Sequence, residues 1–447
     1  MPLCTVRAPI PNGMCRIFSP IHHFFAPQAD RHQFFRALGM LFAIPKYQYG
    51  GSIEKLEQSI AKTFHHDAFL FCTGTDALVA ILKTLNLQKE DELIVPAYTC
   101  FSPGGAVTAA GGTVVFTDVS PHTLSLSFSA IEKSLSSKTR AIIAQHTFGI
   151  PAEEMAALRD LCDRRKILLI EDCAHLVPDG EVHSIGTYGH AVILSFGRYK
   201  AISGMAGGAV ICNDSALAAK VREIQKNSLM IEQSVIARLL LYPILFPLAR
   251  PFIGIGIGTL GLWLCKKFHI LLIGSTPDEL GWKVGETTYR IPNACAFLAL
   301  DQWEQRAEIN DLRRNLTRYY REQAELNHWI FPSSITDNLP LQKFPIFLPG
   351  AERIRKALRR KNIHLYDGCW SRAHLTESGT LAYLYLHQEL LQGERGASAM
   401  MLPIHSTMSL RKAKQLIKEL IKLTHTKDEH DAYYEAPSYP EVNAYAL

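Results

Sequence analysis

The stretch that decides the fold runs from Ile167 to Asp214 and reads ILLIEDCAHLVPDGEVHSIGTYGHAVILSFGRYKAISGMAGGAVICND. It contains three short apolar runs, ILLI, AVILS and GAVIC, which are typical of strands buried on both faces of a sheet. Asp172 closely follows the first run, Ser195 ends the second, and Lys200 lies just beyond it in a loop of small residues. A lysine has no packing reason to lie in such a loop, so the stretch predicts an amine that faces a carboxylate.

An amine and a carboxylate delivered from neighbouring strands suit a site that binds an aldehyde cofactor covalently. Pyridoxal phosphate needs a lysine for a Schiff base and an acid that keeps its pyridine nitrogen protonated. Taken alone, a lysine and an aspartate in loops are more often solvated surface residues. The pattern of the rest of the chain therefore decides between the two interpretations.

Apolar runs on both sides of this stretch complete a regular alternation. With the three quoted, seven runs with little polar alternation lie at 68–72, 92–96, 113–118, 140–146, 167–172, 191–195 and 208–212. Most are separated by helical patterns, which predicts an α/β fold with a doubly wound, mostly parallel seven-stranded sheet. Ligands of such sheets gather at the carboxyl ends of the strands. The candidate residues at those ends are Gly74, Thr75, Tyr98, His146, Asp172, His175, Ser195 and Lys200.

The first of these strand ends carries a small polar turn. Thr73, Gly74, Thr75 and Asp76 follow the run at 68–72, and a helical pattern begins at once. Such a turn aims backbone N–H groups at a phosphate. The same residues also fit an ordinary helix start capped by Thr or Asp, and without its context that interpretation is favoured.

Composition limits the class of protein. Of the 447 residues, 47% are hydrophobic and 20% are charged, as in globular domains. The net charge of +5 is spread along the chain, so we expect no nucleic-acid partner. The ten cysteines show no metal-like spacing, and the N-terminus shows no secretory signal. We therefore expect a cytoplasmic protein without a metal site or structural disulfides.

The order of the patterns also predicts the domains. We expect an N-terminal arm at 1–46 over a partner subunit, a large domain at 47–300 with an apolar insertion at 229–279, a smaller α+β domain at 301–425 and a tail at 426–447. A helix is expected at 34–45 in the arm, and one long helix from Ala299 to about Glu325 begins the small domain.

An ordered set of motifs gives the chain a resemblance to a known family. The motifs are Gly74-Thr75-Asp76-Ala77-Leu78, Val95-Pro96-Ala97-Tyr98-Thr99, Phe116-Thr117-Asp118, His146-Thr147-Phe148-Gly149, Glu171-Asp172-Cys173-Ala174-His175, Ser195-Phe196 with Lys200 and Gly207-Gly208, Tyr289-Arg290, and Leu402-Pro403-Ile404-His405. Over residues 47–228 and 280–425 the chain resembles the DegT/DnrJ/StrS family of nucleotide-sugar aminotransferases. The resemblance implies the fold-type I architecture of pyridoxal-phosphate enzymes and a homodimer.

The resemblance also implies roles for single residues. Lys200 would form the Schiff base and then move a proton, while Asp172 would keep the pyridine nitrogen protonated. The other carried-over contacts are Gly74, Thr75 and Ser195 for the phosphate, and His175 and Tyr98 for the ring. The implied reaction is transamination of a keto-sugar, nucleotide-linked, with glutamate as amino donor, in amino-sugar and surface-polysaccharide biosynthesis.

Two positions depart from the family pattern. Cys100 follows Thr99 where the family commonly has an aromatic that stacks on the ring, so Tyr98, Phe101 or Cys100 itself would cover that face. Thr288 precedes Tyr289-Arg290 where the family often has an asparagine that reaches the partner subunit's phosphate.

The third departure is the apolar segment at 236–274. Arg250 is the only charged residue between Leu239 and Cys265, and Gly256-x-Gly258-x-x-Gly261 matches a dinucleotide fingerprint without its βαβ context. A single membrane span would place one domain on both sides of a bilayer. We therefore expect a hairpin that turns near Pro247–Pro251, either as a peripheral anchor at the inner face of the membrane or as a buried flap or oligomer contact.

Three functions remain open at this point. Transamination of a sugar is the first. A sugar dehydratase of the same family is the second, although that branch typically replaces the Schiff-base lysine with histidine and Lys200 is present. The third is a non-enzymatic, membrane-associated relative with a vestigial site, which the Asp172–Lys200 pair opposes and which Cys100 and Thr288 leave open.

Overall fold

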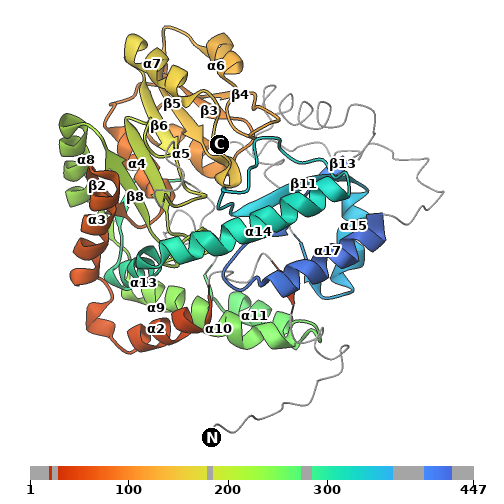
Figure 1. Cartoon of the computed structure of the whole chain (residues 1–447). Helices are drawn as coiled ribbons and strands as arrows, with labels where there is room; N and C mark the ends of the chain where they lie inside the picture. Colours follow the sequence, from red (N-terminus) through yellow and green to blue (C-terminus); the bar gives the residue numbers. More distant parts are fainter. Residues whose placement is uncertain (1–19, 23–28, 179–184, 273–283, 366–396, 425–447) are drawn as a thin grey trace, which may run out of the picture.

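The structure is a computed structural model that describes residues 20–22, 29–178, 185–272, 284–365 and 397–424 (Figure 1). Its large domain is built on a seven-stranded sheet with the spatial order β2-β8-β7-β6-β5-β3-β4. The strands are β2 (Asp67–Phe71), β3 (Glu92–Pro96), β4 (Thr113–Thr117), β5 (Thr139–Gln145), β6 (Leu168–Asp172), β7 (Ala191–Ser195) and β8 (Gly208–Cys212). All seven predicted runs form strands, and the predicted mostly parallel sheet is confirmed.

One strand of the sheet runs in the opposite direction to the others. β8 pairs antiparallel with both β2 and β7, whereas β3, β4, β5, β6 and β7 pair in parallel. The first residues of β8 therefore lie at the edge of the sheet where β2 and β7 end. Gly207 and Gly208 reach the predicted ligand edge for this reason.

Helices cover both faces of the sheet, as the unbroken apolar strands require. In β3, Leu93 and Val95 pack with one group of helices, while Ile94 packs with the other. The first face is covered by α4 (Gly74–Lys83), α5 (Phe101–Ala109) and α8 (Ser215–Asn227). The second is covered by α6 (Phe128–Ser134), α7 (Met155–Arg165), α3 (Gly51–Phe64) and α13 (Asn293–Glu304).

A smaller α+β domain follows, as predicted. It contains α14 (Arg306–Leu326), the antiparallel pair β11 (Lys343–Pro349) and β13 (Ala397–Pro403), α15 (Ala351–Arg359), β12 (Ile363–His364) and α17 (Leu410–Thr424). The expected single helix from Ala299 to Glu325 is two helices, α13 and α14, because the chain turns at Gln305. Figure 1 shows α14 running below the sheet toward the small domain.

The described part of the N-terminal arm contacts its own chain. β1 (Ile21–His22) pairs in parallel with β12, and α2 (Arg31–Leu41) packs against α10 and α13. The short helix η1 (Ile44–Lys46) then leads into α3. The predicted helix at 34–45 is thus shifted toward the N-terminus. The remainder of the arm, residues 273–279 of the predicted insertion and the tail at 426–447 lie outside the described residues.

The apolar insertion forms a helical excursion that leaves and returns at one place. Its two ends pair as β9 (Leu229–Met230) and β10 (Tyr289–Arg290). Between them lie α9 (Gln233–Leu240), α10 (Tyr242–Ala249), the short helix η3 (Arg250–Phe252) and α11 (Ile257–Lys267). α10 and α11 contact each other as a hairpin, and the chain reverses over residues 250–256, slightly later than predicted.

Glycines close this hairpin. Gly256 has φ +82°, in the left-handed region that favours glycine, and it begins α11. A Cβ at Gly258 would lie 2.2 Å from the Ala249 carbonyl oxygen, so only glycine lets α11 approach the end of α10. Gly256 and Gly258 therefore shape a helical turn and not a dinucleotide site, as their context indicated.

One described segment, Gln233–Phe252, is long and apolar enough to cross a membrane by length and composition. Its residues Ile236, Leu239 and Phe246, however, are buried in the core of the large domain together with residues of α2 and α13. This part of the insertion is therefore packed against protein.

Candidate active site

The turn between β2 and α4 is a capped helix start. Thr73 Oγ1 accepts the Asp76 N–H at 2.9 Å and donates to Asp76 Oδ2 at 2.7 Å, so the capping interpretation is correct. Asp76 Oδ1 also accepts the N–H of Tyr289 at 3.2 Å, which ties the turn to β10. Gly74 and Thr75 form the first turn of α4 ahead of its first intrahelical bond, from Ala77 N to Thr73 O. The cap and a phosphate cradle are thus compatible.

Ser195 and two glycines pack against this helix start. A Cβ at Gly74 would lie 2.9 Å from Ser195 Cβ and 3.0 Å from its Oγ. A Cβ at Gly208 would lie 2.3 Å from the Thr73 carbonyl oxygen. Since neither glycine tolerates a side chain, the end of β7 and the start of β8 come into direct contact with the turn. The structure therefore brings Gly74, Thr75 and Ser195 together.

Lys200 lies next to Ser195. A Cβ at Gly197 would lie 3.6 Å from Lys200 Cγ and 3.7 Å from Ser195 Oγ, so the lysine stem and the serine hydroxyl flank the same point. The N–H of Lys200 donates to the Gly197 carbonyl at 3.1 Å, which closes a tight loop after β7. The lysine thus projects from a constrained loop at the ligand edge.

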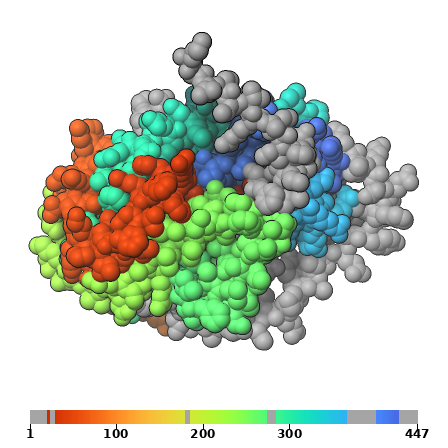
Figure 2. All heavy atoms as spheres, turned by 90° about the horizontal axis from the view of Figure 1, so that it is seen from below, coloured from red at the N-terminus to blue at the C-terminus, as the bar shows by residue number. Residues whose placement is uncertain are grey.

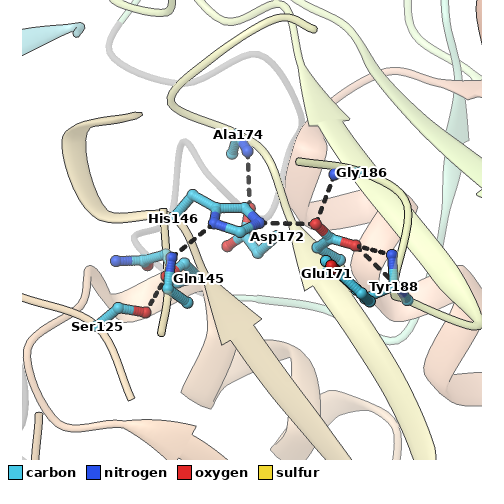
Figure 3. Close-up of polar contacts among 10 residues, drawn as sticks. Ser125, Gln145, His146, Glu171, Asp172, Ala174, Gly186 and Tyr188 are labelled. Carbon is cyan, nitrogen blue, oxygen red and sulfur yellow. Dashed lines mark hydrogen bonds and ion pairs between the residues drawn. The ribbon is translucent and has the colours of Figure 1, made fainter. Parts of the chain in front are cut away.

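Asp172 ends β6 and is buried. Its Oδ1 accepts the Ala174 N–H at 2.9 Å (Figure 3). Burial raises the pKa of Asp172, whereas the Ala174 N–H and then the charge of Lys200 lower it, and the net change is upward. A buried carboxyl with a raised pKa gains from a cationic N–H partner, which is what a protonated pyridine nitrogen offers.

The neighbouring Glu171 points to the opposite side of β6 and organises the loop before β7. Its Oε1 accepts His146 Nε2 at 2.9 Å and Gly186 N–H at 2.5 Å, and its Oε2 accepts the N–H groups of Tyr188 at 3.0 Å and Gly189 at 2.8 Å (Figure 3). Burial would raise the pKa of Glu171, but the bond from His146 and those from the backbone amides outweigh it, so the pKa is lowered.

His146, a candidate by its position after β5, is a structural residue. Its Nδ1 accepts the Ala152 N–H at 3.0 Å, so Nε2 carries the proton that Glu171 accepts. His146, Glu171 and Cys173 form a group with metal-ligand atoms within 4.8 Å of one another. Both nitrogens of His146 and both oxygens of Glu171 are already engaged in hydrogen bonds, which accounts for the group without an ion.

His175 and Tyr98 meet through Phe148. The rings of Phe148 and His175 stack at 5.9 Å between centroids, and Tyr98 meets Phe148 edge-on at 6.2 Å. His175 Nδ1 accepts the Phe148 N–H at 3.2 Å. Burial, followed by the charges of Lys200 and Lys343, lowers the pKa of His175 well below its usual value, so the ring is neutral at pH 7. His175 is thus a neutral ring close to Lys200.

The small domain supplies residues that sequence reasoning missed. Gln342 Nε2 donates to the Tyr199 carbonyl at 2.6 Å, and its N–H donates to the Phe148 carbonyl at 2.8 Å. Arg313, fully buried on α14, donates to the Ala201 carbonyl at 3.0 Å and to the Leu341 carbonyl at 3.3 Å. The carbonyls on both sides of Lys200 are therefore held from another domain.

Lys343, also missed, is a second amine near the site. Its Nζ lies 5.5 Å from the centre of the Phe148 ring, and its charge contributes to the lowered pKa of His175. No local motif marks it, because Lys343 comes close to His175 only through the docking of β11.

The insertion also reaches the lysine loop. Arg198 Nη1 donates to the Leu272 carbonyl at 3.0 Å, and its guanidinium lies 4.4 Å from the centre of the Tyr242 ring on α10. The Tyr242 hydroxyl donates to the same carbonyl of Leu272. The loop that carries Lys200 is thus fastened to the insertion on one side and to the small domain on the other.

The two departures from the family pattern have distinct structural settings. Cys100 caps the start of α5 and is partly exposed, and Phe101 next to it is exposed. Thr288 is buried, and its hydroxyl shares a 2.6 Å hydrogen bond with that of Ser228. The Thr288 side chain is therefore engaged within its own chain.

Comparison with known proteins finds a family whose sequence pattern this chain shares over part of its length. The sequence profile of the DegT/DnrJ/EryC1/StrS aminotransferase family matches residues 31–239. Residues 31–239 therefore resemble this family. The match covers just under half of the chain and ends where the apolar insertion begins.

Named relatives agree with this resemblance. The chain is 31% identical over 277 residues to a GDP-perosamine synthase of Escherichia coli O157:H7, which covers 61% of this chain and 63% of that protein. It is 24% identical over 397 residues to a UDP-4-amino-4-deoxy-L-arabinose–oxoglutarate aminotransferase of Shewanella sediminis, covering 85% and 92%. With a GDP-perosamine synthase of Vibrio cholerae, the match covers 50% of that relative. The chain thus spans half to just under two thirds of the E. coli and Vibrio relatives.

Solved structures share the fold. The structure of NtdA from Bacillus subtilis with bound cofactor PMP aligns with a TM-score of 0.65 at 19% identity, covering 92% of this chain and 84% of that one. PseC of Helicobacter pylori, an aminotransferase of pseudoaminic acid biosynthesis, aligns with a TM-score of 0.63 at 16% identity, covering 91% and 98%. These alignments confirm the predicted fold of pyridoxal-phosphate transferases.

Proposed function

We propose that the protein is a pyridoxal-phosphate-dependent aminotransferase that acts on a keto-sugar. Two observations support the proposal: Lys200 lies beside Ser195, which contacts Gly74, and its charge acts on the buried Asp172 at the end of the neighbouring strand β6. The family resemblance and the sugar aminotransferases among the relatives support the same reaction class. The presence of Lys200 supports transamination over the dehydratase hypothesis.

The residues present fit the cofactor. The start of α4 with Gly74, Thr75 and Ser195 offers a cradle that a Cβ at position 74 would fill, and a phosphate would lie there. Asp172, buried with a raised pKa, would bind the pyridine N–H. When bound, pyridoxal phosphate supplies an aldehyde that condenses with amines and a ring that accepts electron density from the carbon next to the nitrogen.

The protein side of the reaction is binding, orientation and proton transfer. Lys200 would hold the cofactor through Nζ, and its free Nζ would carry the proton that leaves the donor carbon. Gln342 and Arg313 hold the carbonyls of Tyr199 and Ala201, so they fix the direction of the Lys200 side chain. The neutral ring of His175 would lie beside the cofactor without adding a charge.

The amino donor is proposed to be glutamate and the acceptor a nucleotide-linked keto-sugar, in the biosynthesis of a surface polysaccharide. Lys343 supports an anionic donor, because it adds a second positive charge near His175, beside that of Lys200. We propose that Lys343 Nζ binds a donor carboxylate. We also propose a cytoplasmic homodimer, as in the resemblance to the family.

Absorbance of the purified protein with pyridoxal phosphate tests the reaction class. We expect a visible band of protein-bound cofactor that glutamate bleaches and that Lys200→Ala lacks. Borohydride reduction and peptide mass analysis should place a pyridoxyl group on Lys200. A protein that never forms the band, or carries the group on another lysine, would contradict the proposal and leave the vestigial-site hypothesis ahead.

The donor proposal has a separate readout. Lys343→Gln should keep the visible band and raise the glutamate concentration needed to bleach it by at least about tenfold, because a charged hydrogen bond contributes about 1.5–3 kcal/mol. Lys138→Gln serves as the matched control, because Lys138 is exposed and directly precedes β5, at the end of the strand opposite the ligand edge. Equal bleaching by glutamate in Lys343→Gln and wild type would contradict the role of Lys343 alone.

A further inference from the structure

The described part of the apolar insertion leaves many of its large apolar side chains exposed. Those of α9 and α10 belong to the core of the large domain, whereas α11 presents an exposed apolar side. Ile257, Leu260, Leu264 and Phe268 are 63%, 55%, 38% and 67% exposed, and we call them the α11 face. Their spacing of three and four residues places them on one side of the helix. Leu262 and Gly258 lie on the other side, where they are buried.

This arrangement differs from that of the usual amphipathic helix. A surface helix of a soluble protein turns its apolar stripe inward and its polar residues outward. In α11 both sides are apolar, and the outward side includes large aliphatic and aromatic residues. Contiguous exposed apolar side chains of this kind mark an interaction surface and not a random surface composition. Figure 2 views the molecule from below, with the green residues of the insertion beside the orange-red residues of the N-terminal part of the chain.

Charge on the insertion selects the kind of partner. Residues 233–272 contain Arg238, Arg250, Lys266 and Lys267 and no aspartate or glutamate. Lys267 Nζ lies 5.0 Å from the ring centre of Trp263, which is itself half exposed at the border of the α11 face. An apolar face bordered by tryptophan and lysine, within a segment at 233–272 that carries basic residues and no acidic ones, has the composition of helices that lie in an anionic membrane interface.

Length excludes a span by α11. Its eleven residues would extend about 16 Å at 1.5 Å per residue, against about 30 Å of bilayer hydrocarbon. The two ends of the insertion also pair with each other as β9 and β10, so the chain returns to the domain that it left. A helix held in this way can lie in one leaflet only.

We propose that the α11 face docks the protein on an anionic lipid bilayer. Leu260, Leu264 and Phe268 enter the boundary between headgroups and acyl chains, and Lys267 remains among the anionic headgroups. Through Tyr242 and Leu272, the docked insertion is fastened to Arg198 and hence to the loop of Lys200. The candidate active site is thereby held at a fixed position relative to the membrane surface. This inference does not depend on the proposed reaction.

Vesicle flotation of the full chain tests the proposal. Wild type should float with vesicles of phosphatidylcholine and phosphatidylglycerol and much less with phosphatidylcholine alone. Leu260→Asp should lower the vesicle partition coefficient at least about tenfold, because it places a charge where an aliphatic side chain would enter the membrane interface. Lys267→Gln should lower it about fivefold, and only on anionic vesicles, as one lysine contributes about 1 kcal/mol there.

Thr259→Asp is the matched control, because Thr259 is exposed on α11 roughly opposite Phe268 and receives the same charge. It should lower the partition coefficient less than about threefold. Equal melting temperatures of the three variants and wild type would show that each is folded. Failure of wild type to float, or an equal loss in Thr259→Asp, overturns the proposal. The proposal is also overturned if wild type does not bind vesicles and Leu260→Asp sediments as a smaller species than wild type. The α11 face would then contact a second copy of the chain.

Discussion

Replacing Glu171 with glutamine should destabilise the large domain, although the two side chains have nearly the same shape. The carboxylate accepts four hydrogen bonds, two on each oxygen, from His146, Gly186, Tyr188 and Gly189. An amide keeps one accepting oxygen and turns an NH₂ group toward two donors. Two buried N–H groups lose their acceptor at about 1–3 kcal/mol each, so the expected cost is about 2–6 kcal/mol.

Thermal unfolding measures this cost. The entropy of unfolding is about 1 kcal/mol per kelvin for a chain of 447 residues, so the melting temperature at pH 7 should fall by about 2–6 °C. Because the pKa of Glu171 is lowered in the folded protein, its contribution is present above the usual glutamate pKa and is lost as the pH falls through the folded value. The gap between wild type and Glu171→Gln should therefore narrow below about pH 4.3.

Hydrogen exchange adds a local readout, since the amides of Gly186, Tyr188 and Gly189 should exchange faster in Glu171→Gln. Glu132→Gln, an exposed position on α6, is the control and should leave the melting temperature unchanged. A melting temperature of Glu171→Gln within about 1 °C of wild type at pH 7, with unchanged exchange of these amides, would refute the reasoning.

Three further predictions rest on single contacts. His405 is buried and neutral, burial lowers its pKa to about 3, and its Nε2 donates to the His22 carbonyl. Its share of the stability should therefore fall by about 1.4 kcal/mol per pH unit as the pH drops below about 6.5, and His405→Gln should make the pH slope of stability shallower by that amount in denaturant titrations. Gly208→Ala places a Cβ 2.3 Å from a backbone oxygen of Thr73 and should abolish the visible cofactor band. Gly39→Ala on α2, where a Cβ meets nothing within 4 Å, should keep the band. Gln342→Ala should raise the cofactor dissociation constant about three- to tenfold by equilibrium absorbance, since it frees the Tyr199 carbonyl at a cost of about 1 kcal/mol; an unchanged constant would contradict the role of Gln342.

The sheet could be predicted from the sequence because each strand carries its own signal. All seven runs are apolar, short and bounded by turn residues or helical patterns, and burial on both faces makes that pattern independent of distant contacts. The reversal of β8 could not be predicted in this way. Its run, GAVIC, is as apolar as those of the parallel strands, and direction depends on the connection and not on the composition.

In the candidate site, too, residues marked by a local pattern could be predicted, and residues positioned by distant contacts could not. Asp172, Ser195 and Lys200 could be predicted because Asp172 and Ser195 end strands at the ligand edge and Lys200 follows one of them. Gln342 and Arg313 were missed because their positions depend on the docking of two domains, and β13 was missed because its run, ASAMMLP, is weakly patterned. His146 was chosen by position alone, and only the hydrogen bonds to Glu171 and Ala152 reveal that it supports the fold.

The bonds from Gln342 and Arg313 have a consequence for the order in which the protein matures. Gln342 is 143 residues from the Tyr199 carbonyl that it holds, so a ribosome completes the whole sheet and Lys200 long before that partner is made. A growing chain would display the lysine in a loop that is held only from the insertion side. We therefore expect cofactor loading to be a late event, which occurs after release and marks chains whose last third has folded and docked.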